Sequence, residues 1–212
     1  MKLHSYFRSS AAFRVRIALH LKGLAYDAAF VHLAKGQHRA PEYGAVNPQA
    51  LVPTLEDAGH RLTQSLAIIE YLDETRPEKP LLPKDAVGRA RVRSLSLLIA
   101  CEIHPVNNLR VLQHLRSALG QSEDQVNAWY RHWIADGLAK LEADLARQPG
   151  AGRFCHGDAP TMADCCLVPQ IFNAQRYKCD TAAYPAAMRI FGECMKLDAF
   201  DRAQPSKQPD AE

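Results

Sequence analysis

Two kinds of hydrophobic spacing divide the chain. Up to about residue 75, short apolar runs of strand length alternate with helical segments, whereas beyond residue 87 apolar residues recur at helical spacing almost throughout. Between the two parts, Arg76–Pro83 carries three prolines in eight residues, which is typical of a linker. The pattern predicts an α/β domain with one small sheet over residues 1–82 and an all-helical domain over residues 88–212.

The elements of the first domain follow from its apolar runs and turn residues. Ser9 or Ser10 is expected to cap the first helix, and Gly23 to end it. Asp57-Ala58-Gly59 supplies the turn of a hairpin. In chain order we predict a strand over residues 2–7, a helix over 11–22, a strand of buried character over 26–31, hairpin strands over 54–56 and 61–63, and a helix from 65 to about 75.

The second domain is predicted to contain helices only. We expect them over residues 87 to about 119 (one long helix or two), 126–146 and 165 to about 174, with a last helix from Pro185. Pro105 should kink the first of these, because a proline inside a helix removes one backbone hydrogen bond. Thr161 and Asp164 precede the third with the spacing of a capping box. Residues 204–212 are expected to be frayed.

Composition changes this picture little. The chain has 47% hydrophobic and 23% charged residues, as an ordinary globular protein does. A net charge of +3, without lysine and arginine runs among aromatic residues, argues against a nucleic-acid-binding protein. No apolar stretch approaches the ~18 residues of a membrane span, and the first residues lack the apolar core of a signal peptide. We therefore expect a cytoplasmic protein.

Cysteine and histidine give no metal signature. Six cysteines and nine histidines show none of the spacings typical of zinc ligands. The adjacent Cys165 and Cys166 are poorly placed for a disulfide, and no Cys-x-x-Cys occurs. We expect buried, reduced thiols that act as small hydrophobic side chains.

The stretch from Asn47 to Ser65 organises the candidate chemistry. Pro53 stands where the first hairpin strand begins, and the bond before a proline adopts the cis form at little cost. With a cis Val52–Pro53 bond, the amide and carbonyl of Val52 would turn away from the sheet toward another backbone. Gln64 and Ser65 open a helix, whose free amides favour a carboxylate. The stretch predicts a cradle for a small, extended, anionic peptide.

Ser9 and Ser10 are further candidate site residues, because they lie between a predicted strand and a predicted helix. A thiol placed there would be shifted toward the thiolate by hydroxyl donation and by the helix dipole. A plain helix cap uses the same geometry, so the two serines by themselves leave both roles open.

The combination of Val52-Pro53 and Gln64-Ser65 resembles the glutathione-binding half of the glutathione S-transferases. With Tyr6-Phe7-Arg8-Ser9-Ser10 and Thr161-Met162-Ala163-Asp164, the resemblance is closest to the zeta class, the maleylacetoacetate and maleylpyruvate isomerases. It covers essentially the whole chain. The resemblance implies a thioredoxin-like first domain, glutathione as the cofactor, and a homodimer.

The resemblance also implies roles for single residues. Zeta enzymes usually have Ser-Ser-Cys-Ser where this chain has Ser9-Ser10-Ala11-Ala12, so the reactive sulfur would be that of glutathione itself. By analogy with other transferase classes, Tyr6 is a rival thiol activator, although a strand tyrosine also suits the core. The other implied residues are His38 at the glycine carboxylate of glutathione, Asn107 and Asn108 near glutathione or substrate, and His104, which could relay a proton or be structural.

Three arginines are candidate substrate anchors. Arg8 leaves the first strand beside the proposed thiol, and Arg176 lies near a helix C-terminus; the zeta family commonly carries both. Arg110 falls four residues beyond Val106 on an apolar row of the expected long helix, where an arginine would need an anion. Each arginine could instead be a solvated surface charge.

Together these residues indicate a glutathione-dependent cis–trans isomerase of a maleyl diketo acid, as met in aromatic catabolism. The resemblance implies that a thiolate adds to the alkene, that the enolate rotates about the resulting single bond, and that loss of the thiol gives the fumaryl product. A transferase that conjugates electrophiles and a non-catalytic transferase-like module are the alternatives. The arginines disfavour the first, and the retained cradle residues disfavour the second. Because Arg110 would bring two anion sites closer together, we expect maleylpyruvate rather than the longer maleylacetoacetate.

Overall fold

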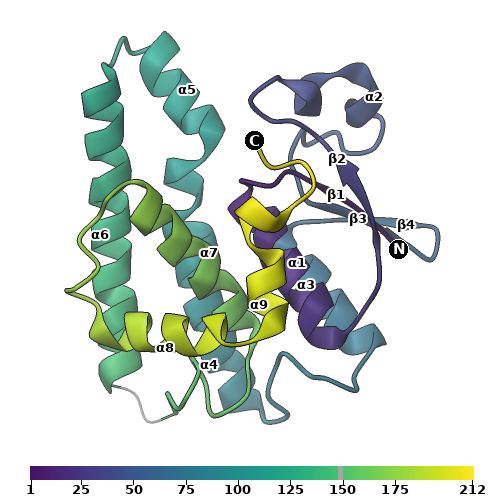
Figure 1. Ribbon diagram of the computed structural model, residues 1–212, viewed down its shortest axis with the longest axis vertical. Coiled ribbons are helices and arrows are strands. Elements are labelled where there is room, and N and C mark those ends of the chain that lie inside the picture. The colour runs from purple at the N-terminus through teal and green to yellow at the C-terminus, as the bar shows by residue number, and fades with distance from the viewer. Residues whose placement is uncertain (148–149) are drawn as a thin grey trace. The chain divides into compact units, whose positions relative to one another are not determined.

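The computed structural model describes residues 1–147 and 150–212, and their contacts divide the chain into two units (Figure 1). The first unit consists of Met1–Leu82 together with Met195–Glu212, and the second of Pro83–Cys194. The sequence pattern predicts that the whole segment after residue 88 belongs to the helical domain. Residues 195–212 join the first unit instead, because they pack along its first helix and bond to its loops.

The first unit contains a four-stranded mixed sheet with the order β2-β1-β3-β4. β1 (Lys2–Ser5) runs parallel to β2 (Asp27–Phe30) and antiparallel to β3 (Thr54–Asp57). β3 and β4 (His60–Thr63) form the predicted hairpin.

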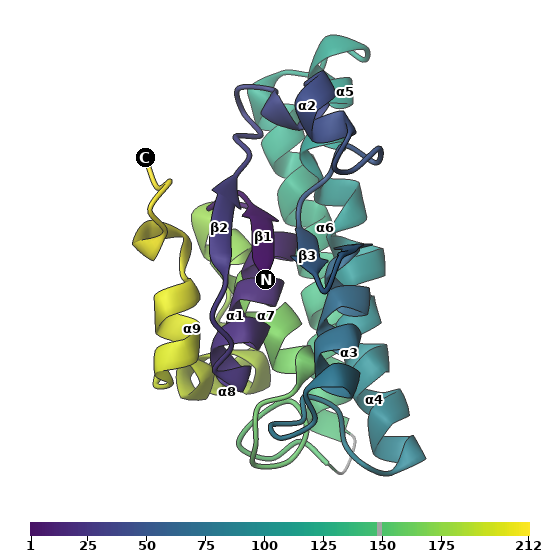
Figure 2. The same cartoon turned by 90° about the vertical axis from the view of Figure 1, so that its right-hand side faces the viewer.

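Two helices pack against each other on this sheet, α1 (Ser10–Lys22) and α3 (Ser65–Thr75) (Figure 2). A short helix, α2 (Pro41–Gly44), lies on the connection from β2 to β3. The core between sheet and helices is formed by fully buried apolar side chains, among them Leu3, Phe13, Ile17, Leu55, Ile68 and Leu72. The thioredoxin-like α/β prediction for this part of the chain is confirmed.

Two details of the strands were predicted wrongly. β1 ends at Ser5 rather than at residue 7, because the chain turns there and the Ser9 amide donates to the Tyr6 carbonyl oxygen (2.9 Å). β2 lacks the expected buried character, and its Phe30 is 43% exposed. The reason is topological, since β2 is an edge strand of the sheet.

The second unit is built from helices, as predicted. In chain order they are α4 (Ala86–Leu97), α5 (Leu109–Ser117), α6 (Glu123–Arg147), α7 (Met162–Arg176) and α8 (Pro185–Met195). Among the residues that the structure describes, no helix is long and apolar enough to span a membrane.

Of the two forms expected for residues 87–119, the structure has two helices, and the chain between them is broken rather than kinked. α4 ends at Leu97 and is followed by a π-helical turn, Leu98–Ile103, and by a 3₁₀ turn, Pro105–Asn107. Asn108 then has an extended backbone, and α5 begins afresh after it. Because a π turn and an extended residue both interrupt the 3.6-residue repeat, a side-chain row of α4 does not continue into α5.

The capping box at α7 is present as predicted. The amide and the hydroxyl group of Thr161 both donate to the Asp164 carboxylate (2.7 and 2.8 Å), and the Cys155 amide donates to it as well (2.8 Å). Burial raises the pKa of Asp164, and these hydrogen bonds oppose the rise. The expectation of buried cysteines is wrong for Cys101, which is exposed, and holds only in part for Cys179.

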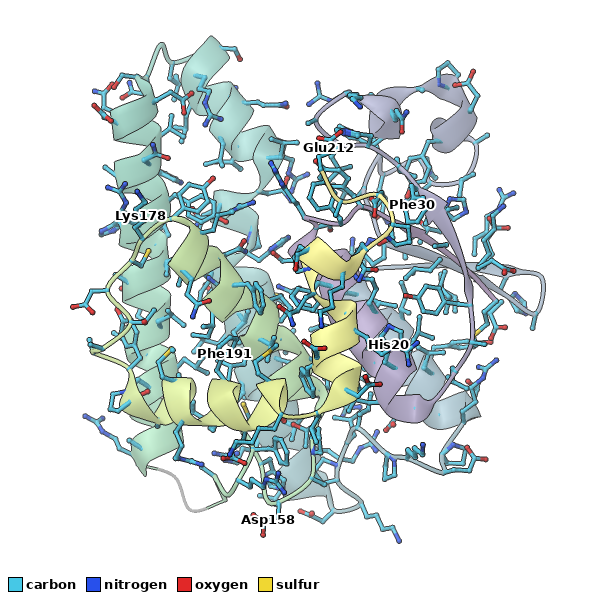
Figure 3. All side chains as sticks on the ribbon, viewed as in Figure 1. His20, Phe30, Asp158, Lys178, Phe191 and Glu212 are labelled. Carbon is cyan, nitrogen blue, oxygen red and sulfur yellow. The ribbon has the colours of Figure 1, made fainter. Side chains whose placement is uncertain are left out.

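The chain after α8 is ordered by specific contacts rather than frayed. α9 (Asp198–Ala203) packs along α1, so Pro185 does not open the last helix. Asp210 accepts a hydrogen bond from the Phe7 amide (3.0 Å). Glu212, labelled at the end of the tail in Figure 3, pairs with His32 (2.8 Å) and Lys35 (3.2 Å).

Gly137, inside α6, allows a test of core packing in the second unit. A Cβ atom there would lie 2.2 Å from Cγ1 and 2.4 Å from Cδ1 of Ile103, whose side chain is 1% exposed. Alanine normally stabilises a helix interior by about 1 kcal/mol relative to glycine, but overpacking a core costs about 1–3 kcal/mol. We expect Gly137→Ala to lower the free energy of unfolding by about 1–2 kcal/mol, measured by urea denaturation.

Gly192 in α8 supplies the matched control, because among the described residues a Cβ built there meets no atom within 4 Å beyond its chain neighbours and the backbone of its own helix. Gly192→Ala should therefore leave the free energy of unfolding unchanged or raise it. A Gly137→Ala protein as stable as Gly192→Ala would contradict the predicted collision with Ile103.

Candidate active site

The register of the sheet gathers the predicted cradle and the predicted serines at one end of the first unit. His4 at the end of β1 pairs with Thr54 at the start of β3, and Thr54 pairs with Thr63 at the end of β4. The residues just beyond these three strand ends therefore lie together at the same end of the sheet. They are Tyr6–Ser10, Val52–Pro53 and Gln64–Ser65.

The Val52–Pro53 peptide bond is cis, which confirms the prediction. Within the described parts of the chain, neither the amide nor the carbonyl group of Val52 takes part in a backbone hydrogen bond. The preceding loop is braced by two side chains that sequence reasoning missed. Tyr43 and Asn47 both donate to the Leu51 carbonyl oxygen (2.6 and 2.8 Å) and both contact the Thr54 hydroxyl group (3.1 Å).

Gln64 and Ser65 open α3, as the sequence predicts. Gln64 has a positive φ of 68°, which is uncommon for a residue with a side chain. Such conformations cost about 1–3 kcal/mol and cluster at functional sites. The Gln64 side chain donates to that of Gln49 (2.9 Å), which holds its exposed end.

A buried arginine links the first turns of the two helices. Arg14 in α1 is 2% exposed, and its Nη1 donates to the Ser65 hydroxyl oxygen (3.2 Å). The N-termini of α1 and α3 therefore lie near each other, with a positive charge between them. Both helix dipoles and this guanidinium favour an anion at that edge. Arg14 was also missed, although an arginine between the apolar residues Phe13 and Val15 was a visible signal.

The two serines lie at the start of α1. Ser9 is the N-cap, and its hydroxyl oxygen accepts from the Ala12 amide (3.2 Å). Since that contact uses only a lone pair, the hydroxyl proton stays available for donation to another group. Capping and thiol activation are therefore compatible in Ser9. Ser10 is the first residue of the helix and is 9% exposed.

Tyr6 has surroundings that favour a role in the core. Its side chain is 6% exposed and belongs to a hydrophobic cluster with Val31, Tyr43 and Val52. Its ring also lies near the rings of Phe7 (4.8 Å between centroids) and His32 (5.0 Å).

His38 is a buried histidine with one ring nitrogen unpaired among the described residues. It lies in the 3₁₀ turn Gln37–Arg39, it is 8% exposed, and its Nδ1 has no hydrogen-bond partner among the described residues. Burial, and then the charge of Arg39, lower its pKa. A buried nitrogen left unpaired costs about 1–3 kcal/mol, so an acceptor on a ligand would be favourable here.

The candidates between α4 and α5 occupy one segment of the second unit. Asn107 is 8% exposed; its Nδ2 donates to the Tyr130 carbonyl oxygen (3.3 Å), and its Oδ1 has no partner among residues 1–147 and 150–212. Asn108 caps α5, where its side-chain oxygen accepts from the Arg110 amide (3.2 Å). His104 is half-buried in the turn.

The sequence argument for Arg110 is corrected by this segment. It assumed a continuous helix with Arg110 on a buried row, but α5 begins after the break, and Arg110 is exposed. Its side chain makes no hydrogen bond or ion pair within the described part of the chain, so its five donors remain available.

Arg8 and Arg176 are also exposed, each over an aromatic ring. The guanidinium of Arg8 lies 5.0 Å from the centroid of the Phe7 ring, and that of Arg176 lies 4.9 Å from the Tyr177 ring. Tyr177 in turn stacks on Tyr130 (3.6 Å). Burial raises the pKa of Tyr130 to about 12, and the nearby Arg176 opposes this rise. The two tyrosines, which the sequence did not single out, hold Arg176 at the end of α7.

A surface hollow of about 690 Å³ in the first unit is lined by none of these candidates. It is lined by residues such as Met1, Asp27 and Gly59, at the opposite end of the sheet from the cis proline. Its mixture of acidic and basic side chains shows no arrangement for catalysis, and we assign it no role.

Comparisons with known proteins agree with this architecture. The model of the glutathione S-transferase N-terminal domain matches residues 8–75, and that of the C-terminal domain matches residues 123–191. A maleylacetoacetate isomerase of Rhizobium meliloti (strain 1021) is 51% identical over 205 residues, which cover 97% of this chain and 96% of the relative.

Two solved structures are similar over 100% of both chains. One is the holo structure of a maleylpyruvate isomerase, described as a bacterial zeta-class glutathione S-transferase, with 47% identity and a TM-score of 0.98. The other is a maleylacetoacetate isomerase of Methylobacterium extorquens AM1 with bound malonate and glutathione, with 45% identity and a TM-score of 0.97. The chain belongs to the glutathione S-transferase family, and within it to the zeta class.

Proposed function

We propose that this protein is a glutathione-dependent cis–trans isomerase of a maleyl diketo acid, with maleylpyruvate as the expected substrate. The observation that carries the proposal is the gathering of Tyr6–Ser10, Val52–Pro53 and Gln64–Ser65 at one end of the sheet. The similar proteins named maleylpyruvate isomerase and maleylacetoacetate isomerase support it at 47% and 51% identity.

The residues at this edge fit glutathione as an anionic peptide. The free backbone groups of Val52 can pair with a peptide backbone, and the start of α3 at Ser65 can receive a carboxylate. The unpaired Nδ1 of the buried His38 suits a second carboxylate. When bound, glutathione would supply a thiol that adds reversibly to the alkene carbon and is released again without net consumption.

The chain's own residues would perform three tasks. Ser9 and Ser10, with the positive end of α1, would hold the bound thiol in its ionised form. Arg8, Arg110 and Arg176 would bind the two carboxylates of the substrate through charge-assisted hydrogen bonds. His104, Asn107 and Asn108 would orient the ligands and donate to the oxygen where negative charge develops.

The test is turnover of maleylpyruvate with glutathione, with S-methylglutathione, and without either. We expect isomerisation only with glutathione, at a concentration of free glutathione that stays constant while product accumulates. A conjugating transferase would consume one glutathione per product, and an interaction module would show no turnover. Full activity in thiol-free buffer would overturn the proposed mechanism.

We also propose that the protein works as a homodimer in the cytoplasm, in the catabolism of aromatic compounds. The dimer rests on similarity to the zeta class. Light scattering should then give a mass near twice that of the 23.6 kDa chain.

His38 allows a prediction about the pH dependence of glutathione binding. Its pKa is lowered in the free protein, so the ring is neutral at neutral pH. A carboxylate bound at Nδ1 would raise this pKa, so binding would take up protons and tighten as the pH falls from about 7 to about 6. We expect His38→Ala to raise the Kd of glutathione roughly tenfold and to abolish this pH dependence, as measured by calorimetry.

His60→Ala is the control, because His60 is exposed in β4, away from the cradle. It should leave both the Kd and its pH dependence unchanged. A His38→Ala protein that still binds glutathione more tightly at the lower pH would show that another group takes up the proton.

A further inference from the structure

Arg16 is a buried cation whose donors converge on the turn that precedes the serines. Its side chain is 1% exposed. Nη2 donates to the Phe7 carbonyl oxygen (3.1 Å), and Nη1 donates to the Ser5 hydroxyl group (3.1 Å) and to the Tyr6 carbonyl oxygen (3.4 Å). Burial lowers its pKa to about 10. Its four hydrogen bonds within the described residues go to neutral oxygens, and the nearby carboxylate of Asp210 opposes the lowering of the pKa. A buried charge without a direct ion pair is costly for stability, which argues that its geometry serves another purpose.

Asp210 also holds this turn, through the backbone amide of Phe7 rather than its carbonyl group. Its carboxylate accepts from the Phe7 amide (3.0 Å), while Arg16 binds the Phe7 carbonyl. Arg16 also donates from Nε to the carbonyl oxygen of Ala203, the last residue of α9 (3.1 Å). One arginine therefore contacts both the turn and the segment that carries Asp210.

The same turn also fixes the position of Ser9 through a backbone hydrogen bond. The Tyr6 carbonyl oxygen that Arg16 contacts also accepts from the Ser9 amide (2.9 Å). Ser9 in turn is fixed to α1 by its side chain and by its carbonyl oxygen, which accepts from the Phe13 amide (2.8 Å). The backbone from Phe7 to Ser9 is thus held at its amide, its carbonyl and its helix cap.

We propose that Asp210 and Arg16 are positioning residues for the thiol-activating serines, and that the C-terminal tail acts on the active site through Asp210. The two residues fix the backbone amide and carbonyl groups of Phe7 and thereby the direction of the Ser9 hydroxyl group, without contact with glutathione or substrate. This inference rests on the proposed function of the serines. Catalysis is sensitive to misplacements of about 1 Å, so a small shift of this turn has a measurable effect.

The chain offers a matched pair of variants in one segment. Asp210→Ala removes the acceptor for the Phe7 amide. Glu212→Ala removes an equal charge two residues later and breaks the pairs with His32 and Lys35, which lie in the loop after β2. Asp210→Asn keeps an acceptor oxygen and serves as the rescue variant.

The first measurement is amide hydrogen exchange of residues 7–10 without glutathione. We expect Asp210→Ala to speed this exchange about tenfold or more, Glu212→Ala to leave it unchanged, and Asp210→Asn to restore much of the protection. Equal exchange rates in Asp210→Ala and the wild type would overturn the proposal. Because no ligand or turnover is involved, this result holds even if the wild type proves inactive and the proposed function fails.

The second measurement is the pH profile of the glutathione-dependent isomerisation. In Asp210→Ala, the apparent pKa of the bound thiol should rise and kcat should fall roughly three- to thirtyfold, with a smaller change in the KM for glutathione. Arg16→Lys, which keeps the charge but loses the fork of donors, should shift the profile in the same direction. A lower melting temperature in Asp210→Ala with an unchanged pH profile would make the contact structural only and overturn the positioning role.

Discussion

The double variant Ser9→Ala/Ser10→Ala is expected to lower kcat/KM roughly 10- to 100-fold at neutral pH and to raise the pKa of the thiol of bound glutathione. A hydrogen bond to a charged group contributes about 1.5–3 kcal/mol, and one pKa unit corresponds to about 1.36 kcal/mol. A free thiol has a pKa of about 8.5. Because the variant thiol should titrate nearer this value, its activity should recover as the pH rises through that range.

Ultraviolet difference absorbance of the thiolate, recorded against pH, measures the pKa directly. Ser9 has a proton free to donate, since within residues 1–147 and 150–212 its hydroxyl group only accepts, from the Ala12 amide. Tyr6→Phe is the informative comparison, because the Tyr6 ring is buried in the core cluster and its hydroxyl group is the rival activator. If the serine variants leave the thiol pKa unchanged and Tyr6→Phe raises it, the serines are caps and Tyr6 activates the thiol.

Loss of the Ser9 cap complicates the experiment, since an N-cap contributes about 1 kcal/mol to stability. Asp85→Ala provides the control. Asp85 is the N-cap of α4, where its carboxylate accepts from the Gly88 amide (2.7 Å). The Asp85→Ala variant should lower the free energy of unfolding by a similar amount and leave the pKa of the bound thiol unchanged. A thiol shift in Asp85→Ala would mean that general destabilisation accounts for the effect.

The parts of the fold that could be predicted are those that depend on neighbouring residues. The hairpin follows from turn residues that lie next to each other, and the start of α3 at Ser65 follows from the end of a strand. The sequence predicted a disturbance near Pro105 and allowed two helices there, but it did not predict the π turn or the extended backbone of Asn108. A proline indicates that a helix is disturbed, while the π turn at Leu98–Ile103 depends on packing that the sequence does not display.

The parts of the candidate site that could not be predicted are contacts between distant segments. Asp210 meets the Phe7 amide from 203 residues away, and Arg14 meets Ser65 from 51 residues away. No periodicity carries such information. Arg14 and Arg16 were nevertheless visible in the sequence, since both interrupt the otherwise apolar run over residues 11–19 of α1, most of which is buried. An arginine in that setting indicates a required hydrogen-bond network, even where the partner is unknown.

Arg110→Ala should discriminate between the two candidate substrates. The guanidinium of Arg110 is exposed and unpaired within the described residues, so it is free to bind an anion. Maleylpyruvate ends in an α-keto carboxylate, which suits two parallel hydrogen bonds from one arginine, whereas maleylacetoacetate has one more methylene before its distal carboxylate. We expect kcat/KM to fall roughly 10- to 30-fold for maleylpyruvate and about threefold for maleylacetoacetate, because one methylene is worth only ~1–3 kcal/mol.

Arg116→Ala is the matched control for Arg110→Ala, since Arg116 lies on the same helix but is already engaged in a two-point ion pair with Glu123. It should leave both activities within about twofold of the wild type, as expected for an exposed pair that contributes little. An equal loss on both substrates in Arg110→Ala would make Arg110 a general anion site. No loss on either substrate would show that Arg110 is a solvated surface charge without a role in substrate binding. The preference for maleylpyruvate would then lack support, because the break between α4 and α5 has already removed the buried-row argument on which it first rested.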